Sequence, residues 1–340
     1  MKVGILNGGG DCAGLNAVTR AVVRRCEHFG YEVVGIRHGW SGLINVDTVP
    51  LRWEVVSHIV NAGGTILHTT RTNPFSRPNG PETVLTNVKK LGLDAVIAVG
   101  GEDTLSVAAK LSQMGLRVIG VPKTIDNDIV ETDMTFGFDS AVNVTVEAID
   151  RILTTGESHD RIMVVEVMGR NSGWIAAYAG VASGANLVLV PEVPVDLEEV
   201  SAFLKMRHDS GETASVVVVG EGCSISGSPP RDASNLDEFG HTRLGGIGDL
   251  LAREIERRVG IETRAVVLGH VVRGGSPSAA DRILATRLGV AAVDTLKNEE
   301  YAIMVCFHNN ALSKIPLADI LGKTKTLDDA TLTLVKEFQV

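Results

Sequence analysis

The chain has 340 residues, of which 44% are hydrophobic, 21% charged and only 4% aromatic. This length exceeds one ordinary hydrophobic core and predicts two lobes, and the composition is typical of an α/β protein with aliphatic cores. The formal net charge of −9 excludes a broad nucleic-acid surface, because a phosphate backbone needs a basic footprint.

The chain carries no sign of export or membrane insertion. No apolar run approaches the roughly 20 residues that span a bilayer, and Met1–Leu6 reads directly as a strand without a signal-peptide core. The four cysteines, Cys12, Cys26, Cys223 and Cys306, match no zinc-binding or redox spacing. We therefore expect a cytoplasmic protein with reduced thiols and no contact with membranes or nucleic acids.

Expected strands and helices alternate along almost the whole chain. The expected helices cover about 15–29, 105–114 and 140–155, and another starts near 245. The expected strands are 3–6, 32–36, 95–99, 118–121, 162–167, 186–190, 214–219, 265–268 and 303–307. This alternation predicts mainly parallel sheets, which bind ligands beyond the carboxyl ends of their strands. The segment 220–246 is the least regular and is expected to be an exposed loop.

A glycine-rich loop, 7–16, joins the first expected strand to the first helix. Its glycines let backbone N–H groups approach an anion, and the positive end of the helix dipole adds to the attraction. The spacing matches neither a dinucleotide-binding fingerprint nor a Walker loop. The loop therefore indicates a phosphate site, with a purely structural tight turn as the alternative.

The most specific chemistry follows two later expected strands, in the segments Gly-Gly-Glu-Asp-Thr (100–104) and Pro-Lys-Thr-Ile-Asp-Asn-Asp (122–128). The acids of the first segment suit Mg²⁺, although they also suit the first turn of a helix. In the second segment, Asp126 and Asp128 lie two residues apart. When a phosphoryl group moves to an alcohol, one carboxylate accepts the hydroxyl proton and cations neutralise the phosphate. The pair predicts a phosphate–metal site with a general base, and a surface turn is the alternative.

Three further segments follow expected strands, at 166–173, 219–222 and 269–277. Each places polar residues, such as Arg170 and His270, beyond a strand end where a sugar hydroxyl or phosphate can bind. Taken singly, either residue is as often an ordinary surface or core residue. Their joint position favours a binding site.

The chain resembles the phosphofructokinase family over nearly its full length. The resemblance rests on four motifs in family order: Gly-Gly-Gly-Asp-Cys-x-Gly-Leu-Asn (8–16), Pro-Lys-Thr-Ile-Asp-Asn-Asp (122–128), Val-Met-Gly-Arg (167–170) and Gly-His-x-x-Arg-Gly-Gly-x-Pro-x-x-x-Asp-Arg (269–282). It implies two Rossmann-like lobes, each a mainly parallel sheet flanked by helices. The expected phosphoryl-donor lobe is 1–137 plus about 272–322, and the expected fructose 6-phosphate lobe is 138–271 plus about 323–340.

The resemblance also implies transfer of a phosphoryl group to the 1-hydroxyl of fructose 6-phosphate, with Mg²⁺. Asp126 is then the base, flanked by Thr124 and Asp128, and Arg170 contacts the transferring group. The residues implied to bind the sugar phosphate are Met168, Gly169, Glu221, His270 and Arg273, with Arg161 and Arg264 reaching the 6-phosphate of a neighbouring subunit. The expected active unit is therefore a homodimer or homotetramer. Gly9, Arg71 and Glu102 lie at the positions for the donor and Mg²⁺, with Glu102 replacing the family's commoner aspartate.

Asp103 and Lys123 carry the prediction of the donor. Relatives that use ATP commonly have glycine at the position of Asp103, whereas those that use pyrophosphate typically have aspartate there and lysine at the position of Lys123. A carboxylate adds bulk, and like charges brought together are unfavourable by roughly several kcal/mol. Lys123 can instead pair with a terminal phosphate as a compact cation. We therefore expect pyrophosphate to be the donor, in a reaction that runs readily in both directions.

Two alternatives stay open. An ATP-dependent member of the family is the first, because lysine at 123 also occurs among ATP users and only Asp103 discriminates. A non-catalytic regulatory subunit that binds sugar phosphate is the second, although such a chain should have lost an acid or arginine from the site. Leu153 stands where an allosteric site would have a basic residue, which predicts weak regulation by ADP or phosphoenolpyruvate.

Overall fold

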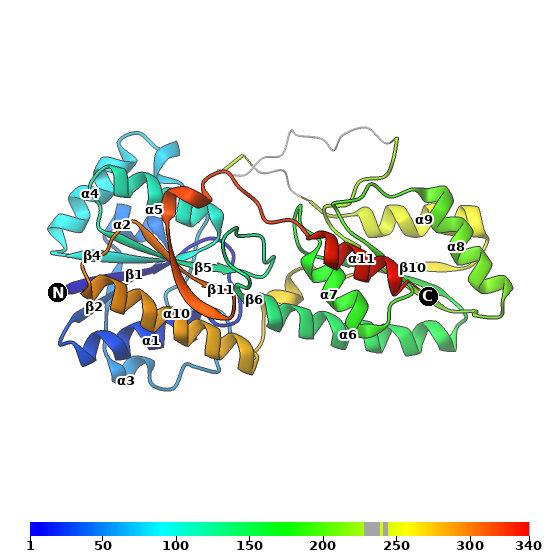
Figure 1. Ribbon diagram of the computed structural model, residues 1–340, viewed down its shortest axis with the longest axis horizontal. Coiled ribbons are helices and arrows are strands. Elements are labelled where there is room, and N and C mark those ends of the chain that lie inside the picture. The colour runs from blue at the N-terminus through cyan, green and yellow to red at the C-terminus, as the bar shows by residue number, and fades with distance from the viewer. Residues whose placement is uncertain (228–238, 241–243, 340) are drawn as a thin grey trace.

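The computed structural model describes residues 1–227, 239–240 and 244–339. The helices and strands form two layered lobes that lie side by side along the long axis of the molecule (Figure 1). Most of the loop expected over 220–246 falls outside the described residues. Within the described residues, no helix has the length and apolar character needed to cross a bilayer.

The first lobe is built on an eight-stranded sheet in the order β12-β11-β5-β4-β1-β2-β3, with β6 paired to β5. Its strands are parallel except at the two edges, where β3 and β12 run antiparallel to their neighbours. The bounds are β1 Lys2–Asn7, β2 Glu32–Ile36, β3 Thr48–Leu51, β4 Ala95–Gly100, β5 Val118–Thr124, β6 Phe136–Gly137, β11 Ile303–His308 and β12 Ala311–Pro316.

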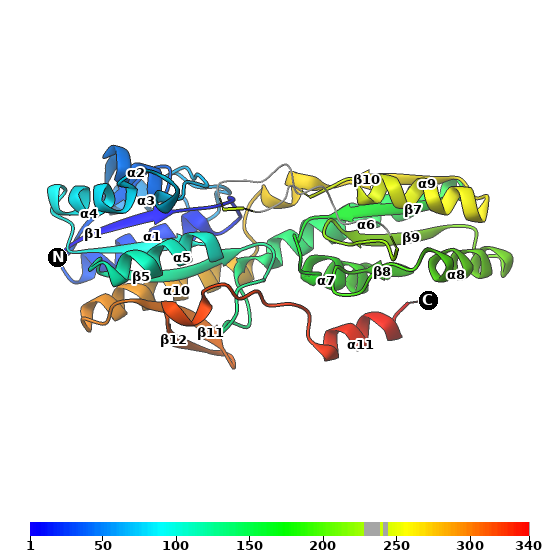
Figure 2. The ribbon, with the colours of Figure 1, turned by 90° about the horizontal axis from the view of Figure 1, so that it is seen from above.

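Helices cover both faces of this sheet, as seen from above in Figure 2. One face packs against α1 (Leu15–His28), α3 (Trp53–Val56) and α10 (Ala279–Lys297), and the other against α2 (Trp40–Asn45), α4 (Gly80–Lys90) and α5 (Glu102–Gln113). Valine, isoleucine, leucine and alanine fill both interfaces. Short 3₁₀ turns, η1 (Pro74–Ser76) and η3 (Leu317–Ile320), complete the lobe.

The second lobe contains four parallel strands in the order β10-β7-β9-β8. They are β7 Ile162–Val167, β8 Leu187–Leu189, β9 Ser215–Gly220 and β10 Thr263–Val267. The flanking helices are α6 Phe138–Ser158 and α7 Trp174–Ser183 on one face, and α8 Leu197–Asp209 and α9 Ile247–Val259 on the other. The 3₁₀ turn η2 (Gly269–Arg273) leads back to the first lobe, and α11 (Asp329–Glu337) packs beside α7 (Figure 1).

The mainly parallel α/β fold predicted from the alternating pattern is confirmed, and most strand bounds differ by one or two residues. Two differences in bounds bear on the site. β5 extends to Thr124 rather than ending at 121, because its last residues are buried and pair with β6. α5 starts at Glu102 rather than at 105, so the acids expected in a loop lie in the first turn of a helix.

Candidate active site

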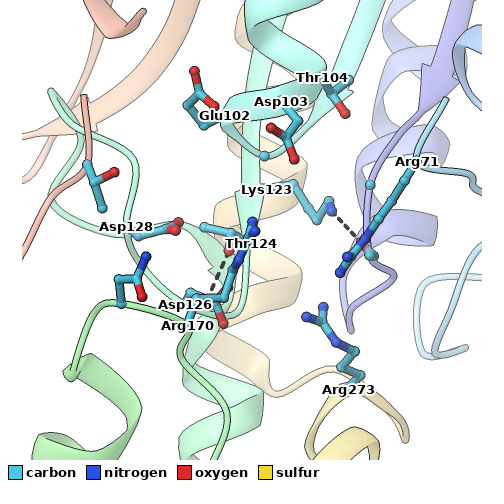
Figure 3. Close-up of a pocket in the computed structure, with 15 residues that line it drawn as sticks. Arg71, Glu102, Asp103, Thr104, Lys123, Thr124, Asp126, Asp128, Arg170 and Arg273 are labelled. Atoms are coloured by element: carbon cyan, nitrogen blue, oxygen red, sulfur yellow. Dashed lines mark hydrogen bonds between the residues drawn. The ribbon is translucent and has the colours of Figure 1, made fainter. Parts of the chain in front are cut away.

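A pocket opens between the lobes at the carboxyl ends of β1, β4 and β5 (Figure 3). Of the predicted site residues, ten line it: Gly9, Arg71, Glu102, Asp103, Lys123, Thr124, Asp126, Asp128, Arg170 and Arg273. Arg71 and Arg273 lie on one side of this view and Asp126 and Asp128 on the other, with Lys123 between them. The pocket therefore combines four cations with four carboxylates.

Backbone hydrogen bonds to neighbouring segments fix the conformation of the glycine-rich loop. The N–H of Gly8 donates to the carbonyl of Val99, and the N–H of Gly9 donates to the carbonyl of Thr70. Gly9 has a φ of +81°, which favours glycine. Gly10 leaves room for Arg273, because a Cβ there would lie 2.6 Å from Nη1 and would displace the guanidinium. This close approach brings the arginine, which comes from the far end of the sequence, onto the loop.

Lys123 reaches the same loop from the end of β5. Its ammonium donates to the carbonyl oxygen of Gly10. The side chain is buried, and burial lowers the pKa of Lys123, an effect that the charges of Cys12 and Asp126 oppose. A buried ammonium beside a backbone cradle is suited to a terminal phosphate group.

Glu102 and Asp103 enter the pocket from the first turn of α5 (Figure 3). Acids in this position are stabilised by the positive end of the helix dipole, so helix capping and ligand binding are compatible here. The backbone N–H of Gly322 donates weakly to Oε1 of Glu102 at 3.4 Å. Glu102 and Asp103 thus form one side of the pocket, which we call the carboxylate wall, and the glycine-rich loop with Lys123 forms another.

Asp126 and Asp128 lie on the loop that follows β5. The backbone N–H of Asp126 donates to the Thr124 hydroxyl at 3.0 Å, and Asn127 turns the chain with a φ of +50°. The Asn127 side chain holds this turn by accepting a hydrogen bond from the N–H of Thr135 at 3.1 Å. Asp126 Oδ1 is buried and has no hydrogen-bond partner among the described residues. Asp126 also lines the pocket, so its carboxylate borders the space that a substrate hydroxyl can enter.

Asp126 and Asp128 interact electrostatically. Burial, together with the negative charge of Asp126, raises the pKa of Asp128 from 3.8 to about 7, while Arg170 opposes the shift. A perturbed carboxyl group in a cleft is typical of acid–base catalysis.

Arg170 comes from the second lobe, just beyond β7. It adopts a left-handed φ of +54°, and its N–H donates to Oε1 of Glu221 at 3.0 Å. The N–H of Gly169 donates to the same oxygen at 3.3 Å. Gly222 is needed beside them, because a methyl group there would overlap the Arg170 carbonyl. Glu221 thus holds the turn that presents Arg170, and burial raises the pKa of Glu221.

The remaining predicted residues do not line this pocket. Met168, Gly169, Glu221 and His270 lie at or just beyond strand ends of the second lobe, on the side of the pocket. Arg161 and Arg264 lie at the opposite, amino ends of β7 and β10, where both form ion pairs with Glu262. One chain therefore does not bring these two arginines to its own pocket.

Five lining residues were missed by the sequence analysis: Gly10, Gly101, Thr104, Asn171 and Thr324. Four of them are direct neighbours of predicted residues, so their position in the motifs was a usable signal. Thr324 has no such signal, because it lies in a segment after η3 that no motif covers.

Comparison with known proteins agrees with this geometry. The family model described as phosphofructokinase matches residues 2–296. A pyrophosphate–fructose 6-phosphate 1-phosphotransferase from Dictyoglomus thermophilum is 48% identical, covering 99% of this chain and 98% of its own. An ATP-dependent 6-phosphofructokinase 3 from Streptomyces coelicolor is 47% identical, with 97% of each chain covered. The crystal structure of Pichia pastoris phosphofructokinase superposes with a TM-score of 0.86 at 28% identity, covering 99% of this chain and 39% of its own. The chain belongs to the phosphofructokinase family.

Proposed function

We propose that the chain is a pyrophosphate-dependent phosphofructokinase, which transfers a phosphoryl group from pyrophosphate to the 1-hydroxyl of fructose 6-phosphate. The observation that carries the donor assignment is Asp103, whose side chain enters the pocket from α5, with Lys123 at its centre. This carboxylate occupies space that a nucleotide's inner phosphate would need, and its negative charge repels that phosphate. Lys123 and the glycine loop remain suited to the compact diphosphate.

The geometry supports Asp126 as the general base. Its carboxylate lines the pocket and is placed to accept the proton of the attacking hydroxyl. Arg71, Lys123 and Arg170 surround the same space and are placed to neutralise the transferring phosphoryl group. Thr124 and Asp128 flank this base, and the Thr124 hydroxyl accepts a hydrogen bond from its backbone N–H.

The donor set fits Mg²⁺, with Glu102 as the proposed ligand. Among the described residues, no three acidic, histidine or cysteine side chains come together as a metal cage. This agrees with Mg²⁺, which usually takes one or two carboxylates together with substrate phosphates and water. When bound, the ion would neutralise phosphate charge, and Glu102 would reach it from the first turn of α5.

We propose that the sugar phosphate lies against the second lobe, near Met168, Gly169, Glu221, His270 and Arg273. Arg161 and Arg264 cannot serve the pocket of their own chain from the amino ends of their strands. Their position supports a site completed by a second copy, in a homodimer or homotetramer.

The test is an aldolase-coupled assay of purified protein with fructose 6-phosphate and Mg²⁺, comparing pyrophosphate and ATP. Turnover with pyrophosphate alone supports the proposal. Turnover with ATP alone keeps the sugar site and overturns the donor assignment, and silence with both donors favours a non-catalytic regulatory subunit.

A variant isolates the residue responsible. Asp103→Gly, alone or with Lys123→Gly, is expected to gain ATP-dependent turnover because it opens space and removes charge. Asp329→Gly is the matched control, since Asp329 also lies in the first turn of a helix but is exposed in α11. No gain of ATP use in either Asp103 variant would show that other residues select the donor.

A further inference from the structure

The segment that follows η3 crosses from the first lobe to the second (Figure 1). We call residues 321–328 the interlobe strap. Its Gly322 N–H faces Glu102, and Thr324 lines the pocket. Near its other end, the N–H of Leu327 donates to Oε1 of Glu192 at 3.0 Å, an oxygen that also accepts from the N–H of Gly173. The strap therefore contacts both the carboxylate wall and the start of α7.

Lys325, at the centre of the strap, contacts both lobes. Its backbone N–H donates to the carbonyl of Asp128 at 2.8 Å. Its ammonium donates to the carbonyls of Thr132 at 2.8 Å and Asp133 at 2.9 Å. All three acceptors belong to the loop between β5 and β6, which carries the catalytic acids. One residue thus holds this loop at two places.

The same residue is fixed from the second lobe. Its carbonyl oxygen accepts hydrogen bonds from the Ser172 hydroxyl at 3.0 Å and from the Trp174 indole at 3.3 Å. Its ammonium lies 5.0 Å from the centre of the Trp174 ring, in cation–π geometry. Ser172 and Trp174 follow Arg170 by a few residues. Lys325 is therefore a direct mechanical link between the loop of Asp126 and the turn of Arg170.

We propose that Lys325 is a positioning residue for phosphoryl transfer, which sets the Asp126–Asp128 loop of one lobe against the Arg170 turn of the other. The proposal rests on the phosphofructokinase activity proposed above. Lys325 does not line the pocket, so it acts through these two segments rather than on substrate. Small displacements of reacting groups reduce rates strongly, whereas binding depends on many other contacts. We therefore expect substitution of Lys325 to lower kcat and to change KM much less.

The charges around Lys325 link this role to pH. Burial lowers the pKa of Lys325 to about 8, and Asp133, Asp128 and Asp328 face it and raise the value. Asp133 is itself paired with His308 at 3.2 Å. Loss of the proton removes the cation–π contact and the positive charge that strengthens the two donated hydrogen bonds. The link between the lobes is then expected to weaken as pH rises above 8.

The experiment compares Lys325→Met, which keeps the apolar stem, with Lys325→Arg, which keeps the charge, and with Lys323→Met. Lys323 is the matched control because it is exposed on the same strap. We expect Lys325→Met to lower kcat by ~10- to 10²-fold, with both KM values changed less than about threefold. We expect the arginine variant to recover most of the rate and the control to stay near wild type.

The pH profile provides the second readout. In wild type, kcat should fall above about pH 8. This fall should disappear in Lys325→Met and move to higher pH in Lys325→Arg, because the guanidinium stays charged. The proposal would be overturned if Lys325→Met raised KM without lowering kcat, or if Lys323→Met lost as much kcat as Lys325→Met. It would also be overturned if the fall of kcat at high pH were the same in Lys325→Arg as in wild type. Wild-type turnover is measured first in the same assay, so failure of the activity itself is recognised separately.

Discussion

Asp126 and Asp128 share one buried loop, and their environments assign them different tasks. Asp126 keeps an oxygen without a partner, whereas Asp128 is pushed toward its neutral form by burial and by its neighbour. The pair is unfavourable for the folded state and useful for the reaction. Such strain at a site is the usual compromise between stability and activity.

Removing the proposed base tests its role directly. Asp126→Ala is expected to lower kcat by ~10²–10⁴-fold, because general-base catalysis has about this magnitude. Binding of fructose 6-phosphate, measured by calorimetry, should be largely kept. Asp139→Ala, a change of the same type in the first turn of α6, should leave kcat near wild type. Full turnover by Asp126→Ala would sink the assignment.

Asp128 makes a separate prediction about stability. Its folded pKa of about 7 lies above the ordinary value of 3.8. The stability it contributes is therefore fully present below about pH 4 and is lost as pH rises toward 7. Asp128→Asn, which cannot ionise, should have a higher Tm than wild type at pH 8, and the difference should shrink toward pH 4. Thermal melts at the two pH values measure this, and equal differences at both would contradict the raised pKa.

At the residue scale, the motifs predicted nine of the residues that line the pocket, and the family resemblance added Arg71. They succeeded because glycine, acid and arginine recur at strand ends, where a parallel sheet collects ligands. Thr324 and Lys325 escaped prediction for a physical reason. Lys325 depends on the backbone carbonyls of Thr132 and Asp133 and on the Trp174 ring, which only the folded chain brings to it. Thr324 lines the pocket only because the same segment crosses between the lobes.

Among the elements, α6 and α10 are joined by a single buried acid. Asp281, in the first turn of α10, accepts hydrogen bonds from the N–H and the hydroxyl of Ser140 in the first turn of α6. The Ser140 hydroxyl in turn accepts from the N–H of Ser278, which caps α10. This small network places the last motif of the sequence against the start of the second lobe.

Asp281→Ala would leave the Ser140 donors buried without their acceptor. Such a loss lowers the free energy of unfolding by ~1–3 kcal/mol. Urea denaturation followed by circular dichroism measures the change. Asp150→Ala, an acid on the exposed side of α6, is the control and should change stability far less. Equal effects of the two substitutions would show that the network contributes little.

The element pattern was predictable where apolar runs were short and bounded by glycine or acids, as in β4 and β7. The antiparallel edges were not, because β3 and β12 are partly exposed and mix polar with apolar residues. The sequence also did not predict which strands pair with each other. β11 joins β5, although most of the second lobe lies between them in the sequence.

For the whole molecule, the proposed function requires a second copy to supply Arg161 and Arg264, which lie at the amino ends of their strands. If a second copy completes the site, two inactive variants should restore each other. Mixing Asp126→Ala with Arg161→Ala subunits should regain turnover, because a hybrid site combines an intact base with intact arginines. Mixing after denaturation and refolding, followed by the coupled assay, measures this. Activity no greater than that of the separate variants would indicate that each chain acts alone.

The late position of β11 has a consequence for biosynthesis. A ribosome delivers β7 to β10 before it delivers β11, so the second lobe can fold while the first sheet is still incomplete. Until Ile303 and Met304 emerge, β5 has an unpaired edge at Ile119 and Gly120, the residues with which they later pair. An unprotected, apolar strand edge invites pairing with other chains. We therefore expect nascent chains stalled just before β11 to aggregate more readily than the complete chain.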